Sequence, residues 1–227
     1  GDSILQFSSI IGCYLFAMGI GSHLSKYVPE RRTLDAFIEI ELLVGLIGGL
    51  SATLLFVTFA WASAPFRSVL YALVFITGVL VGMEIPLVMR VLNSRSLARI
   101  LPPHPLPSPA EGRGGVAAPA VQTEFSEIVS RVLTFDYMGA LAVSLLFPLV
   151  LAPHLGLARS ALLFGLINVG IALMTTHIFR AQLASANTQM ARGAIVMLIL
   201  LGAMMSAERL TRWSEKSIYG DEIIHAQ

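Results

Sequence analysis

The sequence predicts an all-α, polytopic transmembrane helical bundle with about six spans. Of its 227 residues, 56% are hydrophobic and 13% are charged, whereas a soluble protein carries roughly 25% charged residues. Six apolar stretches take up most of the chain, and a helix needs about 20 apolar residues to cross a hydrocarbon core of about 30 Å. In lipid, backbone N–H and C=O groups must form hydrogen bonds with one another, because no water is present. The stretches lack the alternation of apolar and polar residues that is typical of β-barrel strands, so we expect helices.

The expected spans follow one another along the chain. They cover roughly residues 4–24, 36–61, 68–89, 132–151, 160–179 and 194–207. The sixth, between Arg192 and Glu208, is short for a crossing. Pro86 and Pro148 lie inside apolar stretches and are expected to kink their helices, whereas Pro153 is expected to mark a turn.

These features divide the chain into four parts. Helices 1–3 with their loops occupy residues 1–99, and helices 4–6 occupy residues 123–207. Between them lies the segment 100–122, which contains PPHPLPSPAEGRGGVAAP and which we expect to be a mobile, inserted loop because its proline and glycine content prevents a packed core. Residues 208–227 are expected to form a polar linker and the start of a soluble domain that is absent from this chain.

The basic residues predict the orientation of the bundle. Ten of the fifteen Lys and Arg residues fall in the links after the first, third and fifth spans. Cytoplasmic links of membrane proteins carry an excess of Lys and Arg, so we assign these links to the cytoplasm and the N-terminus to the other side. Counting spans then places the tail outside, although it carries Arg209, Arg212 and Lys216, and this conflict stays open.

The spacing of four glycines predicts close helix packing. Gly45 and Gly49, and again Gly78 and Gly82, are four residues apart and therefore share one face of their helix. Lipid gives no hydrophobic drive for helices to associate, and small residues let two backbones approach. We therefore expect these glycines to be packing positions rather than hinges.

Ionisable residues at membrane depth are the candidate contacts for a cation or a polyamine. Four of them lie in or at the edges of apolar stretches: Glu41, Glu84, Asp136 and His177. A charged group there is costly unless it faces a protein interior or an aqueous cavity. One interpretation pairs the carboxylates with Arg90 or Arg131 near the interface, and the other is an acidic cavity that attracts a cation. Glu39 lies about 200° from Glu41 around a helix, so the two cannot share a face.

The sequence argues against several classes of function. A net charge of +1, with the basic residues confined to links, gives no surface for nucleic acid. The single cysteine, Cys13, lies inside the first span, and no His, Cys, Asp and Glu set has metal-ligand spacing, so we expect no metal site. We can define no nucleophile–base pair and no phosphate-binding loop, and we expect no catalytic residue in this segment.

Five phrases together resemble the bacterial membrane-bound spermidine synthases, which are polyamine aminopropyltransferases. They are AMGIGSHLSKYVPE (17–30), FIEIELLVGLIGGLSATLLF (37–56), VLVGMEIPLVMRVL (79–92), VLTFDYMGALAVSLLFPLVLAPHLGLARSALLFGLIN (132–168) and ERLTRWSEKSIYGDEIIHAQ (208–227). The most specific parts are FDYMGAL and WSEKSIYGDEIIHAQ. In that family a multi-span helical module precedes a soluble aminopropyltransferase domain.

The resemblance implies a multi-pass protein of the bacterial inner (cell) membrane in polyamine biosynthesis. Enzymes of the family join an aminopropyl group to putrescine, with decarboxylated S-adenosylmethionine as co-substrate of the catalytic domain. That domain would lie beyond Gln227, so both ends resemble cuts through a longer protein, and no cofactor is expected in this segment. The expected partners are the lipid bilayer, the downstream aminopropyltransferase domain, putrescine or spermidine, and further copies of the chain in a homo-oligomer.

Two alternatives to this membrane module stay open. In the first, the helices form a polyamine or cation transporter, because AMGIGSHLSKYVPERR is faintly similar to a basic loop of major-facilitator carriers. In the second, the insertion and the cut ends belong to a truncated, inactive product. The first interpretation remains a module that anchors the catalytic domain or supplies it with substrate.

Overall fold

The computed structural model describes residues 2–61, 63–100 and 117–219, with side chains described over 3–61, 64–93 and 126–207. Every regular element in these ranges is a helix, so the all-α prediction is confirmed. The predictions for residues 101–116 and 220–227, including most of the inserted loop and the YGDEIIHA phrase, lie outside the described residues.

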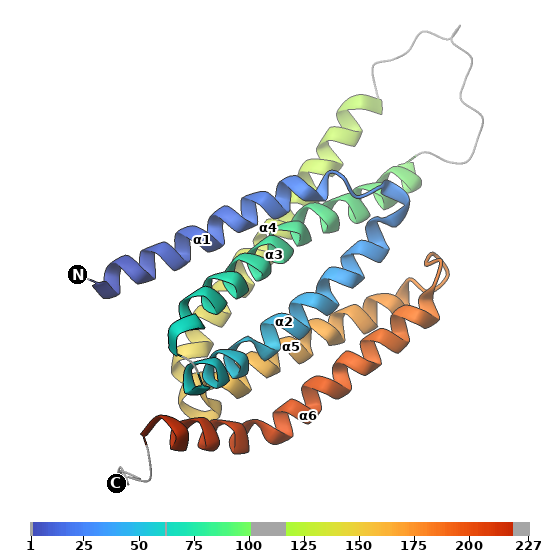
Figure 1. Cartoon of the computed structure of the whole chain (residues 1–227). Helices are drawn as coiled ribbons and strands as arrows, with labels where there is room; N and C mark the ends of the chain where they lie inside the picture. Colours follow the sequence, from blue (N-terminus) through green and yellow to red (C-terminus); the bar gives the residue numbers. More distant parts are fainter. Residues whose placement is uncertain (1, 62, 101–116, 220–227) are drawn as a thin grey trace, which may run out of the picture.

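Six long α-helices make up the described part of the chain. They are α1 (Asp2–Ser25), α2 (Thr33–Trp61), α3 (Ser63–Ile100), α4 (Ala117–Leu146), α5 (Ala152–Ile178) and α6 (Ala186–Tyr219). A 3₁₀ turn, Glu30–Arg32, precedes α2, and a π-helical segment, Phe147–Leu151, connects α4 with α5. The helices run back and forth, so that the ends of α1, α3 and α5 lie at one end of the bundle and their starts lie at the other (Figure 1).

The chain reverses at a glycine near the start of α5. Ser126–Ile178 forms a helical stretch of 53 residues, which would be about 80 Å long if it were straight. Gly156 breaks it, because its φ of 75° lies outside the helical region and in one that residues with a side chain rarely adopt. Pro153, which was expected to mark this turn, lies three residues before Gly156, in the first turn of α5, where a proline is tolerated.

Three helices extend well beyond the expected spans, among them α3, which continues to Ile100 instead of ending near residue 89. α4 begins at Ala117, inside the stretch predicted as a loop, and α6 continues to Tyr219 through residues predicted as a polar linker. Pro86 lies inside α3, and Pro148 lies in the π-helical segment. A π turn is one way in which a helix accommodates a proline that removes a backbone hydrogen bond.

α2 lies at the centre of the packing. On one side, Ile38 and Leu42 form a buried cluster with Leu162 of α5 and Leu200 of α6. On another side, Ile40 and Val44 pack against Leu87 of α3. α1 packs mainly on α3 rather than on α2.

Glycines mark the two closest helix contacts. A Cβ atom at Gly45 would lie 2.8 Å from the carbonyl oxygen of Gly165 in α5, and one at Gly49 would lie 3.2 Å from the Gly165 Cα. In α3, a Cβ atom at Gly78 would lie 2.9 Å from the carbonyl oxygen of Tyr14, and Gly82 lies against the backbone of Met18. Tyr14 and Met18 both belong to α1. Both glycine pairs therefore lie where two backbones meet.

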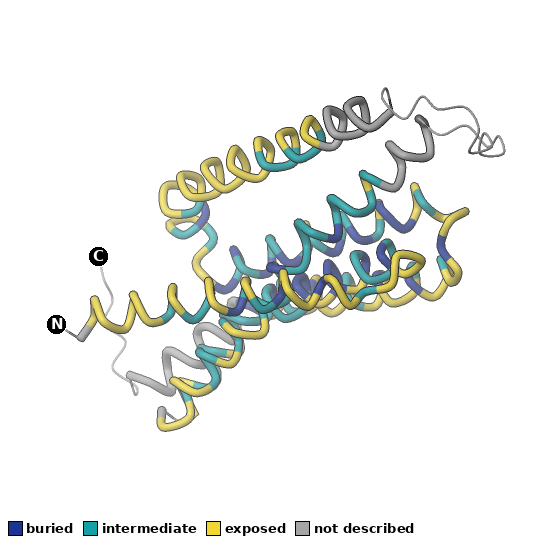
Figure 2. The backbone as a smooth tube through the Cα atoms, turned by 90° about the horizontal axis from the view of Figure 1, so that it is seen from above, coloured by how far each residue is buried: buried dark blue, intermediate teal, exposed yellow. Residues whose placement is uncertain are grey.

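The outer surface of the bundle is apolar. The described residues contain five helical stretches that are long and apolar enough to cross a membrane, by length and composition: Ser3–Ser25, Glu30–Trp61, Ala64–Asn93, Ser126–Ile178 and Ala186–Ala207. The fourth contains the break at Gly156, so these five stretches correspond to the six expected spans. Figure 2 shows that α4 is exposed along most of its described length, whereas the buried residues lie in the other helices.

The α2–α5 contact gives the first prediction. Replacing Gly165 with Ala places a methyl group 2.5 Å from the Gly45 carbonyl oxygen and 2.8 Å from the Gly49 Cα. Overpacking of this kind costs about 1–3 kcal/mol, so the purified protein in detergent should melt at a lower temperature. Gly170→Ala on the same helix is the matched control, because its Cβ would meet no atom within 4 Å. Equal melting temperatures for the two variants would contradict the close contact.

Candidate functional site

Three of the predicted acidic residues lie on helices that pack in turn, α2 on α3 and α3 on α4. Glu41 of α2 and Asp136 of α4 both act electrostatically on the carboxyl group of Glu84 in α3. Glu41 is only 7% exposed. Glu84 is partly buried, and its Oε1 atom is fully buried without a hydrogen-bond partner. Asp136 is exposed on α4. These three residues are called the acidic cluster below.

The register of α2 and α3 explains where the acidic cluster lies. Along α2, Val44 packs against α3 and Gly45 contacts α5. Glu41 is one turn before these two residues, so it lies on the side of α2 between α3 and α5. Along α3, Glu84 is two residues after Gly82, about 200° around the helix. Leu87, one turn after Glu84, packs against Ile40 and Val44 of α2, so Glu84 lies near the side of α3 that faces α2.

The pairing of these carboxylates with Arg90 or Arg131 is wrong. Arg90 donates hydrogen bonds from its two terminal nitrogens to the carbonyl oxygens of Ser25, at 2.9 Å, and Val28, at 2.8 Å. Arg131 forms an ion pair with Glu127, one turn away on the exposed face of α4. A cation at the C-terminus of α1 satisfies carbonyls that the helix leaves free, which explains the choice of Arg90. Among the residues with described side chains, no Lys or Arg forms an ion pair with the acidic cluster.

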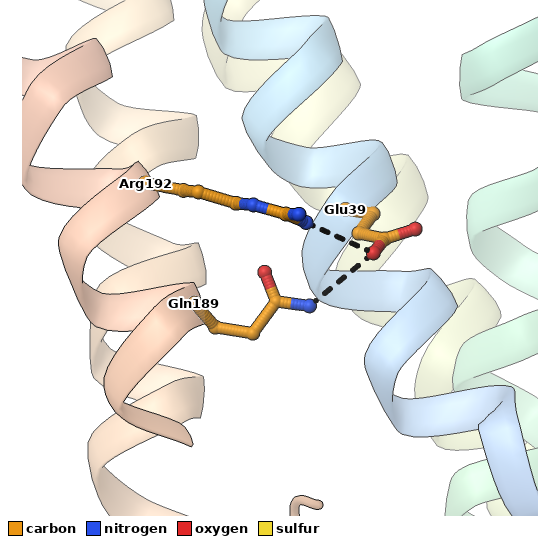
Figure 3. A network of polar contacts seen from close by, with 3 residues as sticks. All are labelled: Glu39, Gln189 and Arg192. Carbon is orange, nitrogen blue, oxygen red and sulfur yellow. Dashed lines mark hydrogen bonds and ion pairs between the residues drawn. The ribbon is translucent and has the colours of Figure 1, made fainter. Parts of the chain in front are cut away.

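Glu39 belongs to a separate polar contact between α2 and α6. Its Oε1 atom accepts hydrogen bonds from Gln189 and from Arg192, each at 3.4 Å (Figure 3). The Arg192 and Glu39 side chains are 59% and 51% exposed, so solvent weakens this ion pair. Glu39 lies at the surface while Glu41 is buried, as their separation around the helix requires. Gln189 was missed, because nothing in the sequence links it to a residue 150 positions away.

His177 lies apart from the acidic cluster. It is exposed in the last turn of α5, and the groups that act on Glu84 are Glu41 and Asp136. Within the described residues, no three His, Cys, Asp or Glu side chains are placed to hold a metal ion. The chemistry that the acidic cluster offers is therefore electrostatic: buried and partly buried carboxyl groups that lack a basic partner in the described part of the chain attract a cation.

Comparison with known proteins covers the whole chain. It is 56% identical over 230 residues to "Polyamine aminopropyltransferase 2" of Ralstonia nicotianae, covering 100% of this chain and 40% of that protein. It is 38% identical over 224 residues to "Polyamine aminopropyltransferase" of Leptospira interrogans, covering 99% of this chain and 39% of that protein. The resemblance to the polyamine aminopropyltransferases is confirmed.

The match also extends to more distant relatives. The chain is 34% identical over 241 residues to "Polyamine aminopropyltransferase 2" of Streptomyces coelicolor, covering 98% of this chain and 37% of that protein. The chain thus spans about 40% of the length of the aminopropyltransferases that it matches. No family model matches the chain, and no solved structure matches it.

The Arg90 contact gives the second prediction. Replacing Arg90 with Gln removes the guanidinium group that binds the Ser25 and Val28 carbonyls, and hydrogen bonds to charged groups contribute roughly 1.5–3 kcal/mol. We expect a lower melting temperature and faster proteolysis of the link between α1 and α2. Arg67→Gln, an exposed arginine at the start of α3, is the control. If both variants behaved alike, the Arg90 contact would have no role in joining α1 to α3.

Proposed function

We propose that this chain is the membrane-embedded module of a polyamine aminopropyltransferase and that it anchors, or supplies with substrate, a catalytic domain elsewhere in the same protein. The observation that carries the proposal is that the full chain is 56% identical to a polyamine aminopropyltransferase. The match covers 40% of that protein. On this basis, the catalytic site for decarboxylated S-adenosylmethionine and putrescine lies in the remaining part of the protein. The relatives give the transporter alternative no support.

The exposed surface supports a place in the bacterial inner membrane. Large apolar side chains lie on the outside of the bundle, among them Leu15 at 59%, Leu198 at 67% and Met205 at 85% exposure. Apolar surface on this scale is unfavourable in water. Within the hydrocarbon core the same side chains contact lipid tails at no cost, while the helices keep their backbone groups bonded.

The basic residues support one orientation. Lys26, Arg32 and Arg180 lie in the links that join helices at one end of the bundle, where α1, α3 and α5 end. By the excess of Lys and Arg in cytoplasmic links, this end faces the cytoplasm. α6 begins at this end and finishes at the opposite one, near the start of α1 (Figure 1).

This arrangement gives the third prediction. Reporters inserted between residues 101 and 116 and fused after Gln227 should emerge on opposite sides of the membrane, because α4, α5 and α6 separate the two sites. Paired fusions to a green fluorescent protein and to alkaline phosphatase read the cytoplasmic and external sides. The same side for both sites would show that one of these three helices does not cross.

A domain exchange gives the fourth prediction. The segment of the Ralstonia relative that matches this chain is replaced by this chain, and the hybrid is expressed in a strain without spermidine synthase. We expect the hybrid to stay in the membrane fraction after carbonate washing and to form spermidine from putrescine. The relative without any such segment is the control. A hybrid in the soluble fraction would overturn the membrane proposal, and a membrane-bound but inactive hybrid would overturn the assignment to this enzyme.

A further inference from the structure

We propose that Glu41, Glu84 and Asp136 form a binding site for an aliphatic amine cation inside the helical bundle, between α2, α3 and α4. The choice of a diamine as the amine rests on the proposed function, whereas the site itself rests on the burial of Glu41 and of the Glu84 Oε1 atom without a basic partner in the described part of the chain.

The first step of the argument is that the acidic cluster has no cation of its own. Arg90, six residues along α3 from Glu84, is held by the carbonyls of Ser25 and Val28. Arg131, five residues along α4 from Asp136, is held by Glu127. Arg192, the basic residue that reaches α2, contacts Glu39 instead. The nearby basic side chains that the structure describes are thus used elsewhere.

The second step is that Glu41 points to a ligand independently of the cluster. It is 7% exposed, and it forms no hydrogen bond or ion pair with any residue of the described part. A buried carboxyl group without a partner is costly and is retained at sites that bind ions or substrates. The Oε1 atom of Glu84 is likewise buried without a hydrogen-bond partner, and Glu41 is one of the two carboxyl groups that act on Glu84.

The third step is the difference in burial among the three acids. Asp136 is exposed on α4, the helix that packs least against the rest of the bundle (Figure 2). The cluster therefore extends from the buried Glu41 through the partly buried Glu84 to an exposed carboxylate. An extended diamine suits such a line of acids better than a metal ion does, because it carries two separated ammonium groups and an apolar chain between them. Ammonium groups form charge-assisted hydrogen bonds with carboxylates.

The test measures binding of radiolabelled putrescine to the full chain in lipid nanodiscs, by scintillation proximity. We expect saturable binding by the parent, with the dissociation constant raised about tenfold or more in Glu84→Gln and Glu41→Gln, because each loses a charge-assisted hydrogen bond. Glu39→Gln is the matched control on α2, since its carboxylate contacts Arg192 at the surface, and it should bind putrescine as the parent does.

Further arms identify the ligand class. Spermidine should compete for the site, whereas the uncharged butane-1,4-diol should not. Equal competition by potassium chloride at the concentration of the amine would overturn the amine assignment. Asp136→Asn, a substitution at an exposed position, keeps the test informative if a variant of a buried residue fails to fold. The inference is overturned if the folded parent shows no saturable binding, or if Asp136→Asn and Glu84→Gln bind as Glu39→Gln does.

The outcome is separable from that of the proposed function. A hybrid enzyme that is active in the domain exchange, together with a chain that binds no putrescine, overturns the amine site alone. An inactive hybrid together with carboxylate-dependent binding overturns the enzyme assignment and leaves the amine site in place.

Discussion

Close backbone contact between α2 and α5 is the constraint on which the rest of the bundle depends. At Gly45, Gly49 and Gly165 neither helix has a side chain, so each backbone lies within van der Waals distance of the other. Lipid tails are as apolar as leucine, so burial of apolar surface gives these helices little reason to associate, and dense packing must supply the attraction. Because α2 also contacts α3 and α6, this one contact positions the helices that carry Glu39, Glu41 and Glu84.

Dense packing around α2 explains why its two glutamates differ. Glu39 reaches the surface and bonds Gln189 and Arg192 of α6, so its charge is balanced and partly solvated. Glu41 lies between α3 and α5, where α2 packs closely on both sides, and it is buried without a described partner. A bundle held together by packing alone gains nothing from a buried carboxyl group, since an apolar residue of similar size would pack there at lower cost. Glu41 is therefore better explained by binding than by stability.

The sequence predicts the helices well because a span of about 20 apolar residues has one stable form in lipid. It predicts their ends less well: α6 continues to Tyr219, because Glu, Arg and Lys remain good helix formers after the apolar stretch has ended. The four-residue glycine spacing identifies the face of α2 that packs, but not Gly165 as its neighbour, since that contact joins residues far apart in sequence. The same separation hides Gln189 and Arg192 from any local pattern, and it explains why Arg90 was assigned to a carboxylate rather than to the end of α1.

The charges of the described residues are separated within the bundle, and this separation bears on where a cation is held. Lys26, Arg32 and Arg180 lie at the end where α1, α3 and α5 finish, so a cation that approaches along the bundle axis from this end is repelled. Away from this end, Glu41 and Asp136 act on Glu84, and no Lys or Arg with a described side chain forms an ion pair with any of the three. Exclusion of water strengthens the attraction between a bound cation and these carboxyl groups, but it also raises the cost of keeping the carboxyl groups charged. A bound cation offsets that cost at Glu41 and Glu84, while the glycine contacts of α2 keep Glu41 in place.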